Sequence, residues 1–167
     1  NNEYINNALL YTIQQFQQTE NKYPETKGMS TTVALIVFDK EGANIAWLGD
    51  SRVYHIRNGE ILFATEDHSL INELAKKGED VSGIKKNIIT KSLNAKTESE
   101  FSTKTIFQNK IHKNDFFFLC TDGVLENITE QKINTIFSQR SEIEKIKQQI
   151  ISECEGKTND NYTFQII

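Results

Sequence analysis

The stretch FFFLCTDGV, residues 116–124, carries five apolar residues in a row directly into Thr121, Asp122 and Gly123. A run of this kind is typical of a buried strand, and the Asp-Gly pair after it indicates a turn. A buried carboxylate without a partner is costly, because desolvation disfavours its charged form. Asp122 therefore either emerges into solvent where the strand ends or meets a positively charged partner there.

The composition is that of an ordinary soluble globular domain. The chain has 167 residues, of which 37% are hydrophobic and 25% charged, enough to build one hydrophobic core. A formal net charge of −4 argues against nucleic acid or an anionic membrane as the main partner. No apolar run reaches the length of a membrane-spanning helix. Cys120 and Cys154 lack the spacing of a disulfide framework or a zinc site, so we expect a reducing, cytoplasmic compartment.

The first half of the chain reads as a helix followed by strands. Apolar residues at helical spacing predict an amphipathic helix over Glu3–Gln18. From residue 31 the sequence is rich in β-branched and apolar residues, which favour strands. Asn58-Gly59 is a strong hairpin signal between two such runs. We therefore expect Ser30–Ala64 to form an antiparallel meander.

The second half mixes both kinds of element. A short helix is expected from Leu70 to about Gly78, a loop over residues 79–86, and residues 87–93 read equally well as strand or helix. Strands are predicted for the segments FSTKTIF and DFFFLC and for the last residues, YTFQII. Two helices are expected before that last strand, one from about Thr129 and one opening on a capping box of Ser141 and Glu144. Grouped rather than alternating elements predict an α+β fold with antiparallel sheet.

Three aspartates share one position relative to the predicted strands. Asp50 and Asp122 each follow a strand, and Asp160 directly precedes one. Strand ends can cluster at one edge of a sheet, where three carboxylates would repel each other unless a cation held them. Carboxylate oxygens suit hard divalent ions such as Mg²⁺ or Mn²⁺. Each aspartate could instead be a turn or capping residue that bonds nearby backbone N–H groups.

Five short blocks occur in an order that resembles a known family. They are GMSTT at 28–32, GDSR at 49–52, EDHSL at 66–70, DFFFLCTDGV at 115–124 and NDNYT at 159–163. Together they resemble the metal-dependent type-2C Ser/Thr protein phosphatases of the compact bacterial kind. The resemblance runs from Gly28 to the end of the chain.

The resemblance implies two antiparallel sheets packed as a sandwich and flanked by helices, in four layers. It implies a binuclear Mg²⁺ or Mn²⁺ site with Asp122 and Asp160 as ligands, and Asp50 holding a third, weaker ion together with Asp122. The implied reaction is hydrolysis of phosphoserine or phosphothreonine on a phosphorylated protein by a metal-activated water, without a covalent phosphoenzyme.

One part of the family pattern is missing. The family's first metal-binding block, an Asp-Gly with further glycines, and a phosphate-gripping basic residue should precede the first helix. This chain has no Asp-Gly before Asp122-Gly123 and no arginine before Arg52. We therefore expect residues 1–167 to be a single domain that is incomplete at its N-terminus, with its opening strands missing. The alternatives are a fragment of a longer enzyme and a catalytically inactive pseudophosphatase that acts as a binding module.

Three other residues have competing interpretations. Ser51 in GDS is also the pattern of a lipase-like esterase nucleophile, but that mechanism needs a base within reach, and no Asp-x-x-His lies near the C-terminus. Arg52 could bind phosphate, although pairing with a neighbouring carboxylate is the simpler expectation. His68 could donate a proton, or be an ordinary histidine at a helix start.

Overall fold

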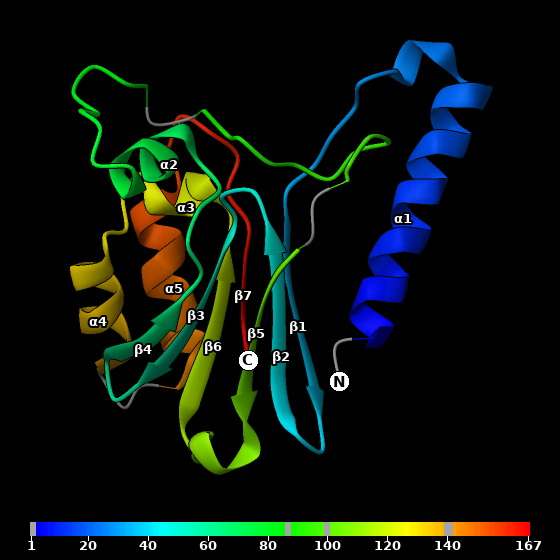
Figure 1. Cartoon of the computed structure of the whole chain (residues 1–167). Coiled ribbons are helices and arrows are strands. Elements are labelled where there is room, and N and C mark those ends of the chain that lie inside the picture. Colours follow the sequence, from blue (N-terminus) through cyan, green and yellow to red (C-terminus); the bar gives the residue numbers. More distant parts are fainter. Residues whose placement is uncertain (1–2, 86–87, 99–100, 139–141) are drawn as a thin grey trace.

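Four layers make up the fold, with one helix, two sheets and a group of helices stacked in that order (Figure 1). The computed structural model describes residues 3–85, 88–98, 101–138 and 142–167. Its elements are α1 (Glu3–Lys22), η1 (Pro24–Thr26), β1 (Val33–Asp39), β2 (Gly42–Leu48), β3 (Arg52–Arg57), β4 (Glu60–Ala64), α2 (Leu70–Lys76), β5 (Ser102–Phe107), η2 (Gln108–Lys110), β6 (Asp115–Cys120), α3 (Asp122–Leu125), α4 (Glu130–Ser138), α5 (Ile143–Cys154) and β7 (Phe164–Ile166). The expected α+β sandwich is confirmed.

Both sheets are antiparallel. One contains β1-β2-β5 and the other β4-β3-β6-β7. The prediction of a single meander over Ser30–Ala64 is therefore wrong, because the chain leaves the first sheet after β2 and enters the second at β3. Gly49, with φ of +104°, lies in the connection and redirects the backbone. Alternation of apolar residues shows which face of a strand is buried but not which sheet the strand joins.

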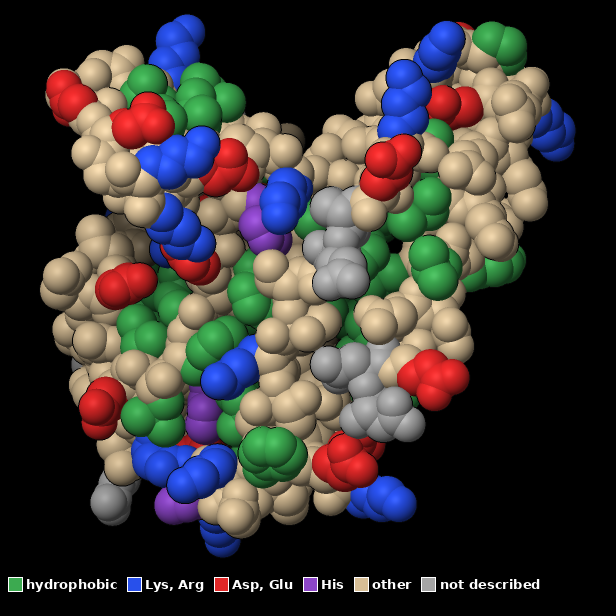
Figure 2. Space-filling view, viewed as in Figure 1, with side chains coloured by type: hydrophobic (Ala, Val, Ile, Leu, Met, Phe, Trp, Pro, Cys, Tyr) green, Lys and Arg blue, Asp and Glu red, His purple; other side chains and the backbone are tan. Residues whose placement is uncertain are grey.

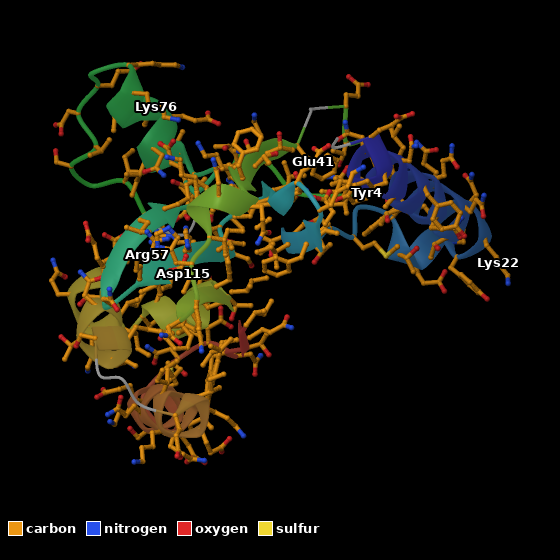
Figure 3. The ribbon with its side chains drawn as sticks, turned by 90° about the horizontal axis from the view of Figure 1, so that it is seen from below. Tyr4, Lys22, Glu41, Arg57, Lys76 and Asp115 are labelled. Atoms are coloured by element: carbon orange, nitrogen blue, oxygen red, sulfur yellow. The ribbon has the colours of Figure 1, made fainter. Side chains whose placement is uncertain are left out.

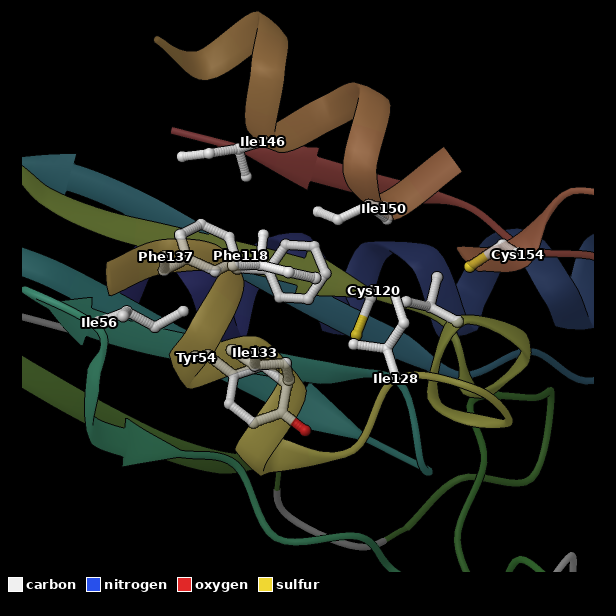
Figure 4. Packing of buried hydrophobic residues seen from close by; sticks show 12 residues of the cluster. Tyr54, Ile56, Phe118, Cys120, Ile128, Ile133, Phe137, Ile146, Ile150 and Cys154 are labelled. Atoms are coloured by element: carbon white, nitrogen blue, oxygen red, sulfur yellow. The ribbon is translucent and has the colours of Figure 1, made fainter. Parts of the chain in front are cut away.

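Hydrophobic side chains fill all three spaces between the layers. Ile45, Val53 and Phe117 belong to the cluster between the sheets, and Ile5 and Leu9 of α1 pack on the outer face of the first sheet. The largest cluster joins the second sheet to α4 and α5 (Figure 4). It contains Tyr54, Ile56, Phe118, Cys120, Val124, Ile128, Ile133, Ile136, Phe137, Ile146, Ile150 and Cys154. This core fixes β3 and β6 rigidly, and these strands carry the candidate site at one end.

Several local predictions are confirmed. The β3–β4 hairpin turns at Asn58 and Gly59, which have φ of 51° and 80°, as a type I′ turn requires. Ser69 caps α2 by accepting a hydrogen bond from the Asn72 N–H, and Gly78 follows that helix with φ of 73°. The helix predicted over Glu3–Gln18 extends to Lys22. Ser141 of the expected capping box lies outside the described residues, and α5 begins at Ile143.

The segment between α2 and β5 contains neither helix nor strand in its described residues. It is tied down by two isolated bridges, Ser69 with Ile89 and Thr31 with Leu93. Asn87, at the start of the ambiguous segment, lies outside the described residues, as does Lys86 of the expected loop. Among the helices described, none combines the length and the hydropathy needed to cross a bilayer.

Candidate metal centre

A cleft of about 480 Å³ at one end of the sandwich contains two of the three predicted aspartates. It is lined by Asp50, Arg52, Asp67, Ser69, Asp122, Leu125, Glu126, Asn127, Lys157 and Asn159. Around α2, near this end, acidic and basic side chains are intermingled on the surface (Figure 2). The surface near the site is therefore not uniformly acidic or basic. What distinguishes the site is the group of carboxylates inside the cleft.

Strand pairing explains why Asp50 and Asp122 meet. β3 and β6 are antiparallel neighbours, and Arg52 at the start of β3 pairs with Cys120 at the end of β6. Asp50 lies two residues before Arg52 and Asp122 two residues after Cys120, so both carboxylates lie at the same end of this pair. Asp122 is the first residue of α3, a short helix that the sequence analysis missed.

Glycines next to both aspartates allow close approach of the chain. A Cβ on Gly49 would collide with the side chain of Thr32, and one on Gly123 would collide with the carbonyl oxygen of Asn161. The Asp160–Asn161 backbone therefore packs directly behind Asp122 and Gly123. The sequence blocks GDSR, TDG and DN are thus adjacent in space at this end of the fold.

Asp50 and Asp122, the two predicted aspartates in the cleft, have no ion-pair partner among the residues that the structure describes. Burial raises the pKa of the Asp50 carboxyl, and the nearby Asp122 carboxylate raises it further. Within the described residues, no lysine, arginine or histidine forms an ion pair with either aspartate. The site is therefore short of positive charge, which a hard divalent cation would supply.

Arg52 is committed to another carboxylate. Its Nε and Nη2 donate to Asp67 at 2.6 and 2.7 Å, and its Nη1 donates to the Tyr54 hydroxyl at 3.0 Å. The expectation that Arg52 pairs with a neighbouring carboxylate is confirmed. Asp67 was not singled out in the sequence, although it lies in the EDHSL block. Its bidentate contact holds the arginine within the cleft wall.

Asp160 is placed differently from the other two aspartates. It is exposed, its Oδ1 accepts the N–H of Asn161 at 2.8 Å, and its carboxylate is not among the cleft-lining groups. Its neighbour Asn159 does line the cleft and donates its N–H to Glu126 at 2.7 Å. Among the residues that the structure describes, no three His, Cys, Asp or Glu side chains converge closely enough to hold an ion by themselves.

Neither Ser51 nor Cys120 has the surroundings of a nucleophile. The Ser51 hydroxyl is 2.8 Å from the Thr32 hydroxyl, and among the described residues no histidine bonds to it, so the esterase interpretation gains no support. Cys120 is a core residue, as expected, and burial raises the pKa of its thiol to about 12. A thiol of that kind is a poor nucleophile near neutral pH.

A second charged cluster, at the opposite end of β3 and β6, was missed in the sequence. Asp115 accepts hydrogen bonds from Arg57 Nε at 2.7 Å and Nη2 at 2.8 Å (Figure 3). Its Oδ2 is also 2.7 Å from His55 Nε2. The pairing of Arg57 with Asp115 across the two strands is the signal that could have found it. Opposite charges facing each other at a strand end are a common stabilising pair.

The chain matches the model of one protein family over most of its length. Residues 2–153 match the family described as protein phosphatase 2C. The serine/threonine phosphatase stp of Listeria welshimeri is 30% identical over 175 residues, which covers 99% of this chain and 68% of that protein. The chain spans between 46% and 68% of the length of the curated relatives it matches.

Solved structures show the same fold. The serine/threonine phosphatase Stp1 of Staphylococcus aureus superimposes with a TM-score of 0.84 at 25% identity, over 98% of this chain and 65% of that one. The catalytic domain of the phosphatase PstP, solved with two manganese ions, gives a TM-score of 0.74 at 21% identity over 92% of this chain and 64% of that one; this likeness concerns the fold. On the family match and these relatives, the chain belongs to the protein phosphatase 2C family.

Proposed function

We propose that this chain is part of a protein phosphatase that hydrolyses phosphoserine and phosphothreonine on proteins with the help of divalent cations. The observation that carries the proposal is the pair Asp50 and Asp122, which share one cleft without an ion-pair partner among the described residues. Membership of the protein phosphatase 2C family supports the same reaction. The relatives are longer, so the activity of the whole protein is part of the proposal.

The donor set fits Mg²⁺ or Mn²⁺ in its chemistry. Both prefer carboxylate oxygens, and the raised pKa of Asp50 reflects a site that favours added positive charge. When bound, such ions supply an activated water and neutralise the negative charge that develops during phosphoryl transfer. The two manganese ions in PstP support a binuclear centre, and a third, weaker ion would take Asp50 together with Asp122.

The positions of Asp50 and Asp122 support their assignment as ligands. Asp122 and Asp50 already face the cleft, held by the ends of β6 and β2. Asp160 would help to hold an ion if its exposed carboxylate turned away from the Asn161 N–H, which it accepts at 2.8 Å. With two carboxylates in place, a complete centre needs further oxygen ligands from water, from substrate or from additional chain.

The test is phosphate release from a phosphothreonine peptide in the presence of Mn²⁺. We expect activity that EDTA abolishes and that Asp122→Asn reduces by at least about 100-fold, since removal of a metal ligand affects both binding and chemistry. The control is Asp80→Asn, because Asp80 is an exposed turn residue bonded to Ser82. Activity that persists in EDTA would contradict the proposal.

A second function, binding of a phosphoprotein without turnover, is favoured by one observation. Within the described residues, only two of the three expected aspartates line the cleft and no three-ligand cluster is formed. This alternative predicts that Mn²⁺ promotes retention of a phosphothreonine peptide without releasing phosphate. Calorimetric titration of the peptide, followed by phosphate analysis of the same sample, separates the two functions.

We also propose a phosphorylated protein as the partner and the cytoplasm as the location. The partner follows from the names of the relatives, which are serine/threonine phosphatases. Support for a reducing compartment comes from Cys120 and Cys154, which are buried and unbridged. Detection of the native protein in fractionated cells tests the location.

A further inference from the structure

His68 is bonded at two points to the residue that precedes Asp50. The backbone N–H of His68 donates to the carbonyl oxygen of Gly49 at 2.9 Å. In return, the backbone N–H of Gly49 donates to Nδ1 of the His68 ring at 3.1 Å. Both backbone polar groups of Gly49 are therefore satisfied by one residue, which belongs to a different sequence block.

The partners of the ring fix its protonation. A backbone N–H can only donate, so Nδ1 must be the acceptor and carries no proton. Nε2 is 2.9 Å from the Ser102 hydroxyl, and in the neutral ring it carries the proton and donates. The ring also stacks against Trp47, with centroids 6.4 Å apart and planes inclined by 22°, and the Trp47 indole N–H donates to the Glu66 carbonyl at 2.9 Å. Hydrogen bonds thus hold the edge of the imidazole ring, and the Trp47 ring packs against one of its faces.

His68 does not face the cleft. Its neighbours Asp67 and Ser69 both line the cleft, whereas His68 does not. Both ring nitrogens are also occupied, one by Gly49 and one by Ser102. A role as proton donor to substrate requires a ring nitrogen directed at the reacting group, so this geometry favours a role that His68 exerts through Gly49.

The segment around Asp50 is secured residue by residue. Ser51 is bonded to Thr32, Arg52 to Asp67, and Gly49 to His68. Arg52 also lines the cleft but is bonded to Asp67, whereas the Asp50 side chain lines the cleft and forms no ion pair with a described residue. Gly49 has φ of +104°. Because a glycine backbone can adopt many other conformations, contacts from other residues are needed to hold this one.

We propose that His68 is a positioning residue, which clamps Gly49 through an Nδ1 acceptor and thereby holds the Asp50 carboxylate in place for a divalent cation. The proposal rests on the proposed metal-dependent function. Groups that orient a ligand without touching the metal typically change metal affinity by about 10- to 100-fold when removed. The specific requirement is a hydrogen-bond acceptor at the position of Nδ1.

Two substitutions separate the two ring nitrogens. In His68→Asn, the Oδ1 of the amide takes the place of Nδ1 and preserves the acceptor for the Gly49 N–H. In His68→Gln, the terminal amide takes the place of Nε2 and preserves the donor to Ser102, but leaves Gly49 without its acceptor. His68→Ala removes both contacts. His112→Asn is the matched control, because His112 is exposed and lies in the loop between η2 and β6, at the other end of the sandwich (Figure 1).

Two measurements are made on each variant after circular dichroism has confirmed that it is folded. Calorimetric titration with Mn²⁺ gives the dissociation constant, and amide hydrogen exchange measured without metal gives the protection of the Gly49 N–H. We expect His68→Gln and His68→Ala to weaken Mn²⁺ binding about 10-fold or more and to expose the Gly49 N–H to exchange. His68→Asn and His112→Asn should resemble the wild type in both measurements.

Each outcome decides between distinct conclusions. Equal Mn²⁺ affinity in wild type, His68→Gln and His68→Ala would overturn the positioning role while leaving the metal site intact. A His68→Asn protein as impaired as His68→Gln would also overturn it, because the acceptor alone would not be the cause. A wild-type protein that binds no Mn²⁺ would overturn the proposed metal site and this inference with it.

Discussion

The same two strands carry a carboxylate site at each end, and the two ends differ in where the balancing charge comes from. At one end, Asp115 is almost fully buried and receives hydrogen bonds from Arg57, His55 and the His112 N–H. At the other end, Asp50 and Asp122 share a cleft and form no ion pair with any described residue. The two ends are about 17 Å apart, given five residues at about 3.4 Å each along β3.

The difference shows in the acidity of the carboxyl groups. Burial alone would raise the pKa of Asp115, but hydrogen bonds from Arg57, His112 and His55 together hold it well below its usual range. Burial and Asp122 raise the pKa of Asp50. The ionised Asp115 carboxylate therefore stabilises the fold, whereas the ionised Asp50 carboxylate destabilises it. The second arrangement is the one expected of a site that binds an external cation.

The largest expected effect comes from breaking the internally neutralised end. Asp115→Asn should lower the free energy of unfolding by about 3 kcal/mol, because it leaves the Arg57 and His55 groups without their shared buried partner. Urea denaturation measures the loss. The matched control is Asp39→Asn, an aspartate that also accepts backbone N–H bonds but at an exposed hairpin; a loss as large there would contradict the special role of the buried cluster.

The opposite end should respond in the opposite sense. Asp122→Asn in metal-free protein removes one of two repelling carboxylates, so we expect its free energy of unfolding to stay within about 1 kcal/mol of the wild type or to rise. The same variant should lose most of its stabilisation by Mn²⁺. A metal-free Asp122→Asn protein as unstable as Asp115→Asn would show that Asp122 is a structural residue.

The pH dependence of stability separates the two ends further. A carboxyl whose pKa is raised on folding, such as Asp50, stabilises the fold below its unfolded pKa of about 3.9, and this contribution is lost as pH rises through the folded pKa. Without metal, the wild type should therefore lose stability relative to Asp50→Asn as the pH rises above about 4. Urea unfolding of both proteins at several pH values measures the difference. If the wild type instead gained stability relative to Asp50→Asn as the pH rises, the raised pKa of Asp50 would be contradicted.

Much of this asymmetry could be predicted from sequence, and some could not. Asp50 and Asp122 stood out because each follows an apolar run, and they meet because the strand after Asp50, β3, pairs antiparallel with the strand before Asp122, β6. The family resemblance implied two sheets, but the residues did not show that the chain changes sheet between β2 and β3, because the GDSR connection also fits a tight turn between paired strands. The His55–Asp115 contact was missed because it is diagonal: His55 pairs with Phe117 and Asp115 with Arg57 across the two strands, and the sequence does not give this register. Asp160 was found by its position next to a predicted strand and by its motif, and neither specifies the direction of the side chain.

Arg52 provides the most delicate test of the comparison, because it is a cation in the wall of the cleft that is withheld from the acid pair by Asp67. Its guanidinium donates to both Asp67 oxygens, and both side chains are partly exposed, so the pair itself is worth only about 1 kcal/mol. Asp67→Asn should release Arg52 to approach Asp50, whose pKa already responds to its charge. The Arg52 guanidinium would then compete with a divalent cation for the carboxylate of Asp50.

We expect this release to weaken Mn²⁺ binding several-fold, by about 1 kcal/mol in free energy, while changing the stability of the metal-free protein little. Calorimetric titration of Asp67→Asn measures the affinity. The double variant Asp67→Asn with Arg52→Gln should recover it, because the competing charge is gone. If the double variant remains as weak as the single one, Asp67 affects the metal site directly and not through Arg52.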